Sequence, residues 1–121
     1  MPLYTIMTQS EVLDNDAKAK LASELTEFHS GYSGVPKEWV HIVFHDYEKG
    51  NGFSAGVLAS TATLNLLIRT GRSVDYKLQM LERLWQLFQR ATGAPDDQIV
   101  IGIQEVEASN AMEMGKAMPR V

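Results

Sequence analysis

The sequence predicts an α+β fold in which tandem βαβ repeats form a four-stranded sheet with two helices on one face. The main observation is internal similarity. The segment GVPKEWVHIVFHD begins at Gly34, and its counterpart GAPDDQIVIGIQE begins at Gly93, about half the chain further on. In each, Gly-x-Pro and a few polar residues precede an alternating apolar run that ends in an acidic residue. The two repeats cover about residues 2–46 and 61–105 of a single expected domain, 1–121.

Two helices are predicted over about 14–30 and 74–91, because apolar residues recur there at helical spacing. They are Ala17, Leu21, Leu25 and Phe28 in the first helix and Leu78, Leu81, Trp85 and Phe88 in the second. Each helix is expected to end near glycine, at Gly31 or Gly34 and at Gly93. Apolar strand candidates, 3–8 and 64–69, precede the helices. A strand–helix–strand unit this short makes a right-handed crossover, and two units together cover one face of the sheet.

The remaining segments are short. Gly50-Asn51-Gly52-Phe53 carries an Asn-Gly signal that predicts a hairpin between the repeats. With Gly56 these glycines have the spacing GxGxxxG, but no helix follows, so the hairpin is favoured over a nucleotide-binding loop. After Glu105 the pattern predicts a short helix over about 109–115. The open face of so small a sheet needs a cover, and an oligomer would supply it.

Composition narrows the function classes. The chain has 121 residues, of which 45% are hydrophobic, with 11 basic and 15 acidic side chains that give a net charge of −4. Such dispersed, mildly acidic charge disfavours nucleic-acid and anionic-membrane partners. There is no cysteine, which excludes thiolate catalysis and cysteine metal sites. No leader or membrane-spanning segment is expected, so the chain is predicted to be cytoplasmic.

Pro2 raises the first chemical question, since position 2 tolerates many residues. Proline permits removal of Met1, and the mature chain would then begin with a secondary amine held by a strand. A terminal amine titrates near ~8, and burial among apolar and cationic groups would lower its pKa toward neutrality. Such an amine could serve as a general base.

Arg69 and Arg72 stand in IRTGRS, at a predicted strand-to-helix turn. Two guanidinium groups there can converge on one carboxylate, and the first turn of the helix adds backbone N–H groups. The alternative is a pair of solvated surface arginines.

The histidines do not suggest a metal site. His41 and His45 lie in and just past a predicted strand, where four residues span ~13 Å, too far to share an ion. His29 lies late in the first helix and would on its own be read as a structural or capping residue. Glu113 would be read as an exposed carboxylate.

Together these residues resemble the tautomerase superfamily, and within it cis-3-chloroacrylic acid dehalogenase and its homologues. The resemblance runs from Pro2 to about Pro119. It rests on PLYTIM, on LTEFHSGYSG around His29, on RTGRSVDYK and on AMEMGKAMP, which contains Glu113.

The resemblance implies a tautomerase-like fold and specific roles. Pro2 would be the catalytic amine. Arg69, Arg72 and His29 would hold the substrate carboxylate, and Glu113 would position or activate water. It also implies a homotrimer that needs no metal or organic cofactor and acts on small carboxylates.

One departure shifts the expected activity. The dehalogenase group has a tyrosine on the last core strand, where IVIGIQE places Gly102. Glycine lacks the tyrosine hydroxyl, so water activation would rest on Glu113 alone, whereas tautomerisation needs only the amine and the groups that bind the carboxylate. The expected activity is therefore keto–enol tautomerisation of small or aryl-bearing 2-keto acids, which could use the added space. The alternatives are hydration or dehalogenation of cis-3-haloacrylate-type acids, and a non-catalytic trimer that binds carboxylates or a protein. A ferredoxin-like ligand-binding domain shares the βαβ repeat but has no use for a terminal proline.

Overall fold

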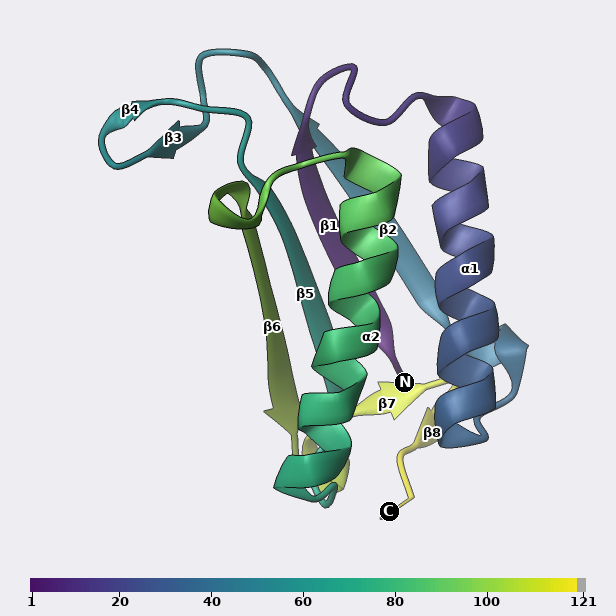
Figure 1. Ribbon diagram of the computed structural model, residues 1–121. Helices are drawn as coiled ribbons and strands as arrows, with labels where there is room; N and C mark the ends of the chain where they lie inside the picture. The colour runs from purple at the N-terminus through teal and green to yellow at the C-terminus, as the bar shows by residue number, and fades with distance from the viewer. Residues whose placement is uncertain (120–121) are drawn as a thin grey trace.

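The computed structural model describes residues 1–119 of the chain. Two α-helices pack on one layer of sheet (Figure 1). The strands are β1 Leu3–Gln9, β2 His41–Tyr47, β3 Phe53–Ser54, β4 Val57–Leu58, β5 Ala62–Arg69, β6 Ile99–Val106, β7 Met112–Glu113 and β8 Lys116–Ala117. The helices are α1 Asn15–Ser33 and α2 Val74–Thr92, with short 3₁₀ turns η1 Lys37–Trp39, η2 Asp96–Gln98 and η3 Ala108–Asn110.

The four long strands form one sheet in the order β2-β1-β5-β6. β1 is parallel to β2, β5 is parallel to β6, and the two central strands, β1 and β5, are antiparallel. Each parallel pair is joined through a helix, and both helices lie on the same face. The predicted α+β architecture is confirmed. Because the two central strands are antiparallel, the start of β1 and the end of β5 lie side by side at the same end of the sheet.

Side-chain caps define both helices. Asp14 accepts a hydrogen bond from the Ala17 N–H at the start of α1, and Ser73 accepts one from the Tyr76 N–H at the start of α2. Both helices end at glycine in the left-handed conformation, at Gly34 and Gly93, with φ of 81° and 68°. The first helix therefore passes through Gly31, one of its two predicted ends.

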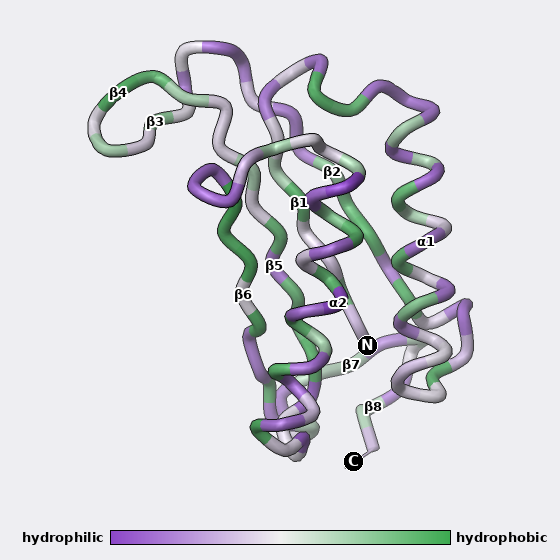
Figure 2. Tube along the Cα trace, in the orientation of Figure 1, coloured by the Kyte–Doolittle hydropathy of each residue, from purple (hydrophilic) through white to green (hydrophobic). Residues whose placement is uncertain are grey.

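Strand alternation places the core between the sheet and the helices. Tyr4 and Ile6 of β1 and Leu64 and Leu66 of β5 are fully buried on the helix face. The hydropathy colouring shows apolar positions alternating with polar ones along the strands and helices (Figure 2). The other sheet face has no helix and exposes several apolar side chains. Their exposed fractions are 43% for Met7, 45% for Val43 and 64% for Val100.

Two local predictions differ from the structure. The predicted short helix at 109–115 is wrong, because the chain forms the β7–β8 hairpin there. Met114 and Gly115 both have positive φ, as a tight two-residue hairpin turn requires, and no helix can pass through them. The hairpin between the repeats exists, but its turn lies at Ala55-Gly56 rather than at Asn-Gly.

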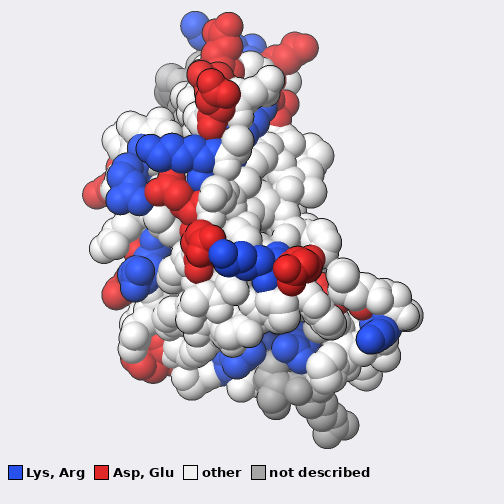
Figure 3. All heavy atoms as spheres, turned by 90° about the vertical axis from the view of Figure 1, so that its right-hand side faces the viewer, with Lys and Arg blue, Asp and Glu red and all other residues white. Residues whose placement is uncertain are grey.

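Charge is distributed without a large patch of one sign on the face that carries α1. Acidic and basic side chains are interspersed over that view (Figure 3). Within residues 1–119, no helix is both long and apolar enough to cross a membrane.

Candidate functional site

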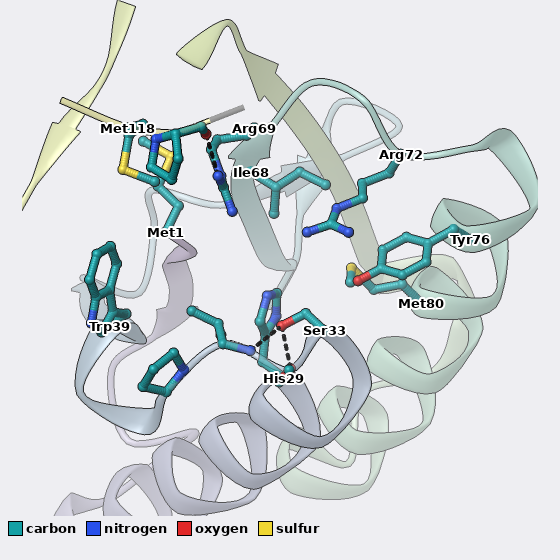
Figure 4. Close-up of a pocket in the computed structure, with 14 residues that line it drawn as sticks. Met1, His29, Ser33, Trp39, Ile68, Arg69, Arg72, Tyr76, Met80 and Met118 are labelled. Atoms are coloured by element: carbon teal, nitrogen blue, oxygen red, sulfur yellow. Dashed lines mark hydrogen bonds between the residues drawn. The ribbon is translucent and has the colours of Figure 1, made fainter. Parts of the chain in front are cut away.

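A cavity of about 270 Å³ opens where β1 begins and β5 ends, between the last turn of α1 and the first turns of α2 (Figure 4). Its walls come from both halves of the chain and from the C-terminal segment. The residues that line it are Met1, His29, Ser33, Gly34, Val35, Pro36, Trp39, Ile68, Arg69, Arg72, Tyr76, Met80, Met118 and Pro119. The cavity therefore combines cationic and apolar walls.

Both predicted arginines face this cavity. Arg69 is the last residue of β5, and Arg72 follows in the turn that leads into α2. Arg69 also donates a hydrogen bond to the Pro119 carbonyl. Burial, together with the charge of Arg72, lowers the pKa of Arg69 from its ordinary value. An anion placed between the two guanidinium groups would relieve this repulsion, so the arrangement suits a carboxylate.

His29 is buried in the last part of α1, with 3% of its surface exposed. Its Nδ1 lies 2.6 Å from the hydroxyl oxygen of Tyr4, on the adjoining strand β1. Burial, followed by the positive charges of the N-terminal amine and Arg72, lowers the pKa of His29 to about 4. The ring is therefore neutral at pH 7 and carries one N–H.

The Tyr4 contact determines which nitrogen of His29 carries that proton. Burial raises the pKa of Tyr4, so its phenol stays protonated and needs an acceptor. Since His29 Nδ1 is the partner of this hydroxyl, Nδ1 accepts and Nε2 carries the hydrogen. His29 thus offers an N–H donor at the cavity wall without a positive charge.

Pro2 and Glu113 lie at the same end of the molecule. Pro2 is buried immediately before β1, and its carbonyl accepts a hydrogen bond from the His41 N–H of β2 at 3.1 Å. Its nitrogen is bonded to Met1, which reaches the cavity. The Met1 ammonium group pairs with the carboxylate of Glu113 in β7, whose side chain is 12% exposed. The carboxylate is therefore largely enclosed, in contrast to the exposed position that its local pattern suggested.

The Met1 amine reports on the electrostatics of this position. Its pKa is lowered from 8.0 to about 6, chiefly by burial and then by the positive charge of Arg69. Burial and Arg69 thus favour the neutral form of this amine, whereas the adjacent Glu113 carboxylate favours the charged form.

Neither Pro2 nor Glu113 is among the residues that line the cavity, although Met1 between them is. Three other residues that the sequence singled out, His41, His45 and Gly102, also lie away from the lining. His41 and His45 are exposed on β2, on the sheet face opposite the helices. Within residues 1–119, no group of three or more histidine, aspartate or glutamate side chains has a metal-binding arrangement. Gly102 pairs with Asn65 on the same open face, where an added Cβ would meet only the Asn65 Oδ1 at 3.7 Å.

Sequence reasoning missed two tyrosines. Tyr4 appeared only as part of an apolar strand, although a buried phenol on the helix face must find a partner. Tyr76 was hidden in the first turn of α2, and it lines the cavity beside Arg72. A tyrosine in the first turn of a helix gives no local signal of such a position.

Residues 1–121 match the family model Tautomerase_3, described as "Putative oxalocrotonate tautomerase enzyme". Among curated proteins, none matches the sequence.

Several solved structures share the fold. The crystal structure of native Ps01740 is 31% identical with a TM-score of 0.88, over 92% of this chain and 99% of that one. N1, a member of the cis-3-chloroacrylic acid dehalogenase family, is 25% identical with a TM-score of 0.89, over 97% of this chain and 83% of that one. A fused 4-OT that forms a symmetric trimer is 18% identical with a TM-score of 0.86, over 96% and 94% of the two chains.

Proposed function

Because this chain belongs to the tautomerase superfamily, in the family whose model spans residues 1–121, we propose that it is a cofactor-independent tautomerase of 2-oxo acids. The catalytic base is the amine of Pro2, freed by removal of Met1. The observation that carries the proposal is the cavity at the chain start, which brings Arg69, Arg72 and His29 together beside Met1.

The Pro2 amine suits a general base because of its surroundings. The terminal amine one residue earlier has its pKa lowered to about 6 by burial and by Arg69. Pro2 is itself buried, and the hydrogen bond from His41 fixes its carbonyl. Burial and the nearby Arg69 would therefore favour the neutral form of its amine, and the strand would hold it in one position, as proton transfer requires.

The substrate carboxylate is assigned to the arginines. Arg69 and Arg72 offer several N–H donors, and the neutral His29 adds the Nε2–H without a third cationic charge. With the carboxylate held there, the rest of the acid would lie within the cavity, whose wall Met1 reaches at the chain start. Positioning of this kind converts a slow bimolecular proton transfer into a fast local one.

The proposed reaction is an isomerisation with no net change in atoms or electrons. The amine of Pro2 takes the proton from the C2 hydroxyl of the enol, and the C2–oxygen bond becomes a carbonyl. The electron pair of the C2–C3 double bond then takes a proton from the protonated amine at C3. The amine is neutral again at the end of the cycle.

Replacement of Pro2 by alanine tests this proposal. With the enol form of an arylpyruvate as substrate, kcat/KM should fall on the order of 10²-fold, the usual contribution of a positioned general base. Pro95→Ala, in the matching Gly-x-Pro of the second repeat, is the control and should retain activity. Intact mass must first show that the protein begins at residue 2. Unchanged turnover by Pro2→Ala would refute the role, and carboxylate binding without turnover by the wild type would favour a non-catalytic binding protein.

A second candidate activity is the addition of water to unsaturated acids, including cis-3-haloacrylates. The enclosed carboxylate of Glu113 at the terminal amine favours it, since that carboxylate could position water. Here Pro2 would act as an acid. If this activity exists, Glu113→Gln should abolish it, and Gly102→Tyr should raise it. Glu113→Gln should leave tautomerisation largely intact, so the two activities can be separated.

We also infer that the protein is a homotrimer that packs through its open sheet face. The exposed side chains of Met7, Val43 and Val100 support this assignment, because an assembly would remove them from water. A fused 4-OT of the same fold forms a symmetric trimer. Sedimentation equilibrium should give three times the chain mass for the wild type and a smaller mass for Val100→Lys.

A further inference from the structure

One polar group in the cavity wall has no role in the scheme above, namely the hydroxyl of Tyr76. Its oxygen is inaccessible to water and has no hydrogen-bond partner among the described residues. A buried hydroxyl without a partner destabilises a fold, so its presence calls for an explanation. A ligand in the cavity would provide one.

The Tyr76 ring is held from two sides. The ring of Tyr32 in α1 lies 4.8 Å from it, centre to centre, at an angle of 56°. The Tyr32 hydroxyl donates to the backbone carbonyl of Tyr76 at 2.8 Å, which ties the two helices together at this point. The guanidinium carbon of Arg72 lies 5.1 Å from the centre of the Tyr76 ring. The side chain is therefore placed by its neighbours.

The hydroxyl points into the cavity. In Figure 4 the oxygen of Tyr76 is directed away from its helix, toward the space between the Arg72 guanidinium and His29. Tyr76 and Arg72 thus present two different kinds of donor side by side, one neutral and one cationic. This pairing matches a ligand that carries a carboxylate and a second oxygen on the adjacent carbon.

We propose that Tyr76 donates a hydrogen bond to the C2 oxygen of a 2-oxo acid whose carboxylate lies on Arg72 and Arg69, and so selects 2-oxo acids over acids without this oxygen. The inference rests on the proposed function and names the residue that recognises its substrate class. Tyr76 is then a substrate-contacting residue, and it keeps its proton throughout.

Two features support the donor role. Burial raises the pKa of Tyr76, while the charge of Arg72 opposes that effect, so the phenol remains protonated at neutral pH and can donate. During tautomerisation the C2 oxygen gains negative charge as the enol loses its proton. A neutral donor already in place then stabilises this charge without adding another cation to a site that holds two arginines.

Binding of two matched acids tests the inference. 2-Oxobutanoate and butanoate differ only in the C2 oxygen, and isothermal titration calorimetry on the mature chain gives Kd for each. The wild type should prefer 2-oxobutanoate. Tyr76→Phe removes the hydroxyl alone. It should raise the Kd for 2-oxobutanoate roughly tenfold, as expected for the loss of one hydrogen bond, while the Kd for butanoate stays unchanged.

Two further measurements separate this role from a structural one. Tyr47→Phe removes a hydroxyl that donates to the Thr61 carbonyl, away from the cavity lining, and should leave the ratio of the two Kd values unchanged. Because the Tyr76 hydroxyl is unpaired, Tyr76→Phe should unfold at the same temperature as the wild type or higher.

An equal effect of Tyr76→Phe on both acids, or no effect on either, would overturn the inference. These binding results do not depend on proton transfer. The base role of Pro2 can therefore fail in the turnover assay while Tyr76 still discriminates between the acids, and the reverse can also occur.

Discussion

Acidification should remove a defined part of the folding stability through His29. The pKa of this residue is lowered to about 4 in the folded chain, mainly by burial, with added repulsion from the N-terminal amine and Arg72. In the unfolded chain it would titrate near ~6.5. Between these values the unfolded chain binds a proton more readily than the folded chain. The stability that neutral His29 contributes is therefore fully present above pH 6.5 and is lost as the pH falls toward 4.

The size of the effect follows from the two pKa values. A difference from 6.5 to about 4 corresponds to a loss of about 3 kcal/mol in the free energy of unfolding between pH 7 and pH 4. Because His29 is only 3% exposed, solvent screening reduces this loss of stability only slightly. Urea unfolding at one fixed protein concentration measures it, with His29→Gln as a variant that stays polar beside Tyr4 but cannot titrate.

Two results would refute this reasoning. The first is a free energy of unfolding that falls equally with pH in the wild type and in His29→Gln. The second is a His29 signal that titrates near 6.5 by nuclear magnetic resonance. The variant identifies the His29 signal in these spectra by its absence.

Three other outcomes are expected. Arg72→Ala should raise KM for a 2-oxo acid roughly ten- to a hundredfold, because a charge-assisted contact to the carboxylate is lost. Arg90→Ala, whose partner is a surface glutamate, is the control, and an equal effect of both would contradict the assignment. kcat/KM should rise with pH to a plateau, with a midpoint below the usual ~8 of a terminal amine, because the neutral amine is the base. Arg69→Gln should move that midpoint upward, since Arg69 helps to lower the amine pKa, and an unmoved midpoint would argue against this coupling. Tyr4→Phe should lower the free energy of unfolding by about 1–3 kcal/mol, because the buried histidine nitrogen loses its partner. An unchanged free energy of unfolding, measured by urea denaturation, would contradict the pairing.

Most of the fold was predictable because it follows from local patterns. Helical spacing and the Gly-x-Pro turns identified both helices, and the repeated strand–helix–strand order led to the four-stranded sheet. The prediction of a helix in the C-terminal segment was wrong for a physical reason. Its composition is compatible with a helix, but Met114 and Gly115 turn the chain back with positive φ, and the hairpin that results packs against the chain start. Such a contact between distant segments has no local signal.

The residues of the candidate site were likewise predictable only where the signal is local in the sequence. Arg69 and Arg72 are close in sequence, so their convergence was foreseeable from the turn that joins them. His29 could be predicted as a site residue from the sequence. Its hydrogen-bond partner Tyr4, which fixes the position of its proton, lies 25 residues away along the chain and could not be predicted. Tyr76 was missed because a tyrosine in a first helical turn is ordinary. Only the packing of Tyr32 and Arg72 against its ring directs the hydroxyl into the cavity.

Turnover by one sequence in two forms tests most directly whether the Pro2 amine is the base. The chain that begins at Pro2 and the chain that retains Met1 can be separated and identified by intact mass. Both are then assayed with the enol form of an arylpyruvate. Only the form with a free Pro2 amine should be active, with kcat/KM on the order of 10²-fold or more above the other. Equal turnover by the two forms would contradict catalysis by Pro2.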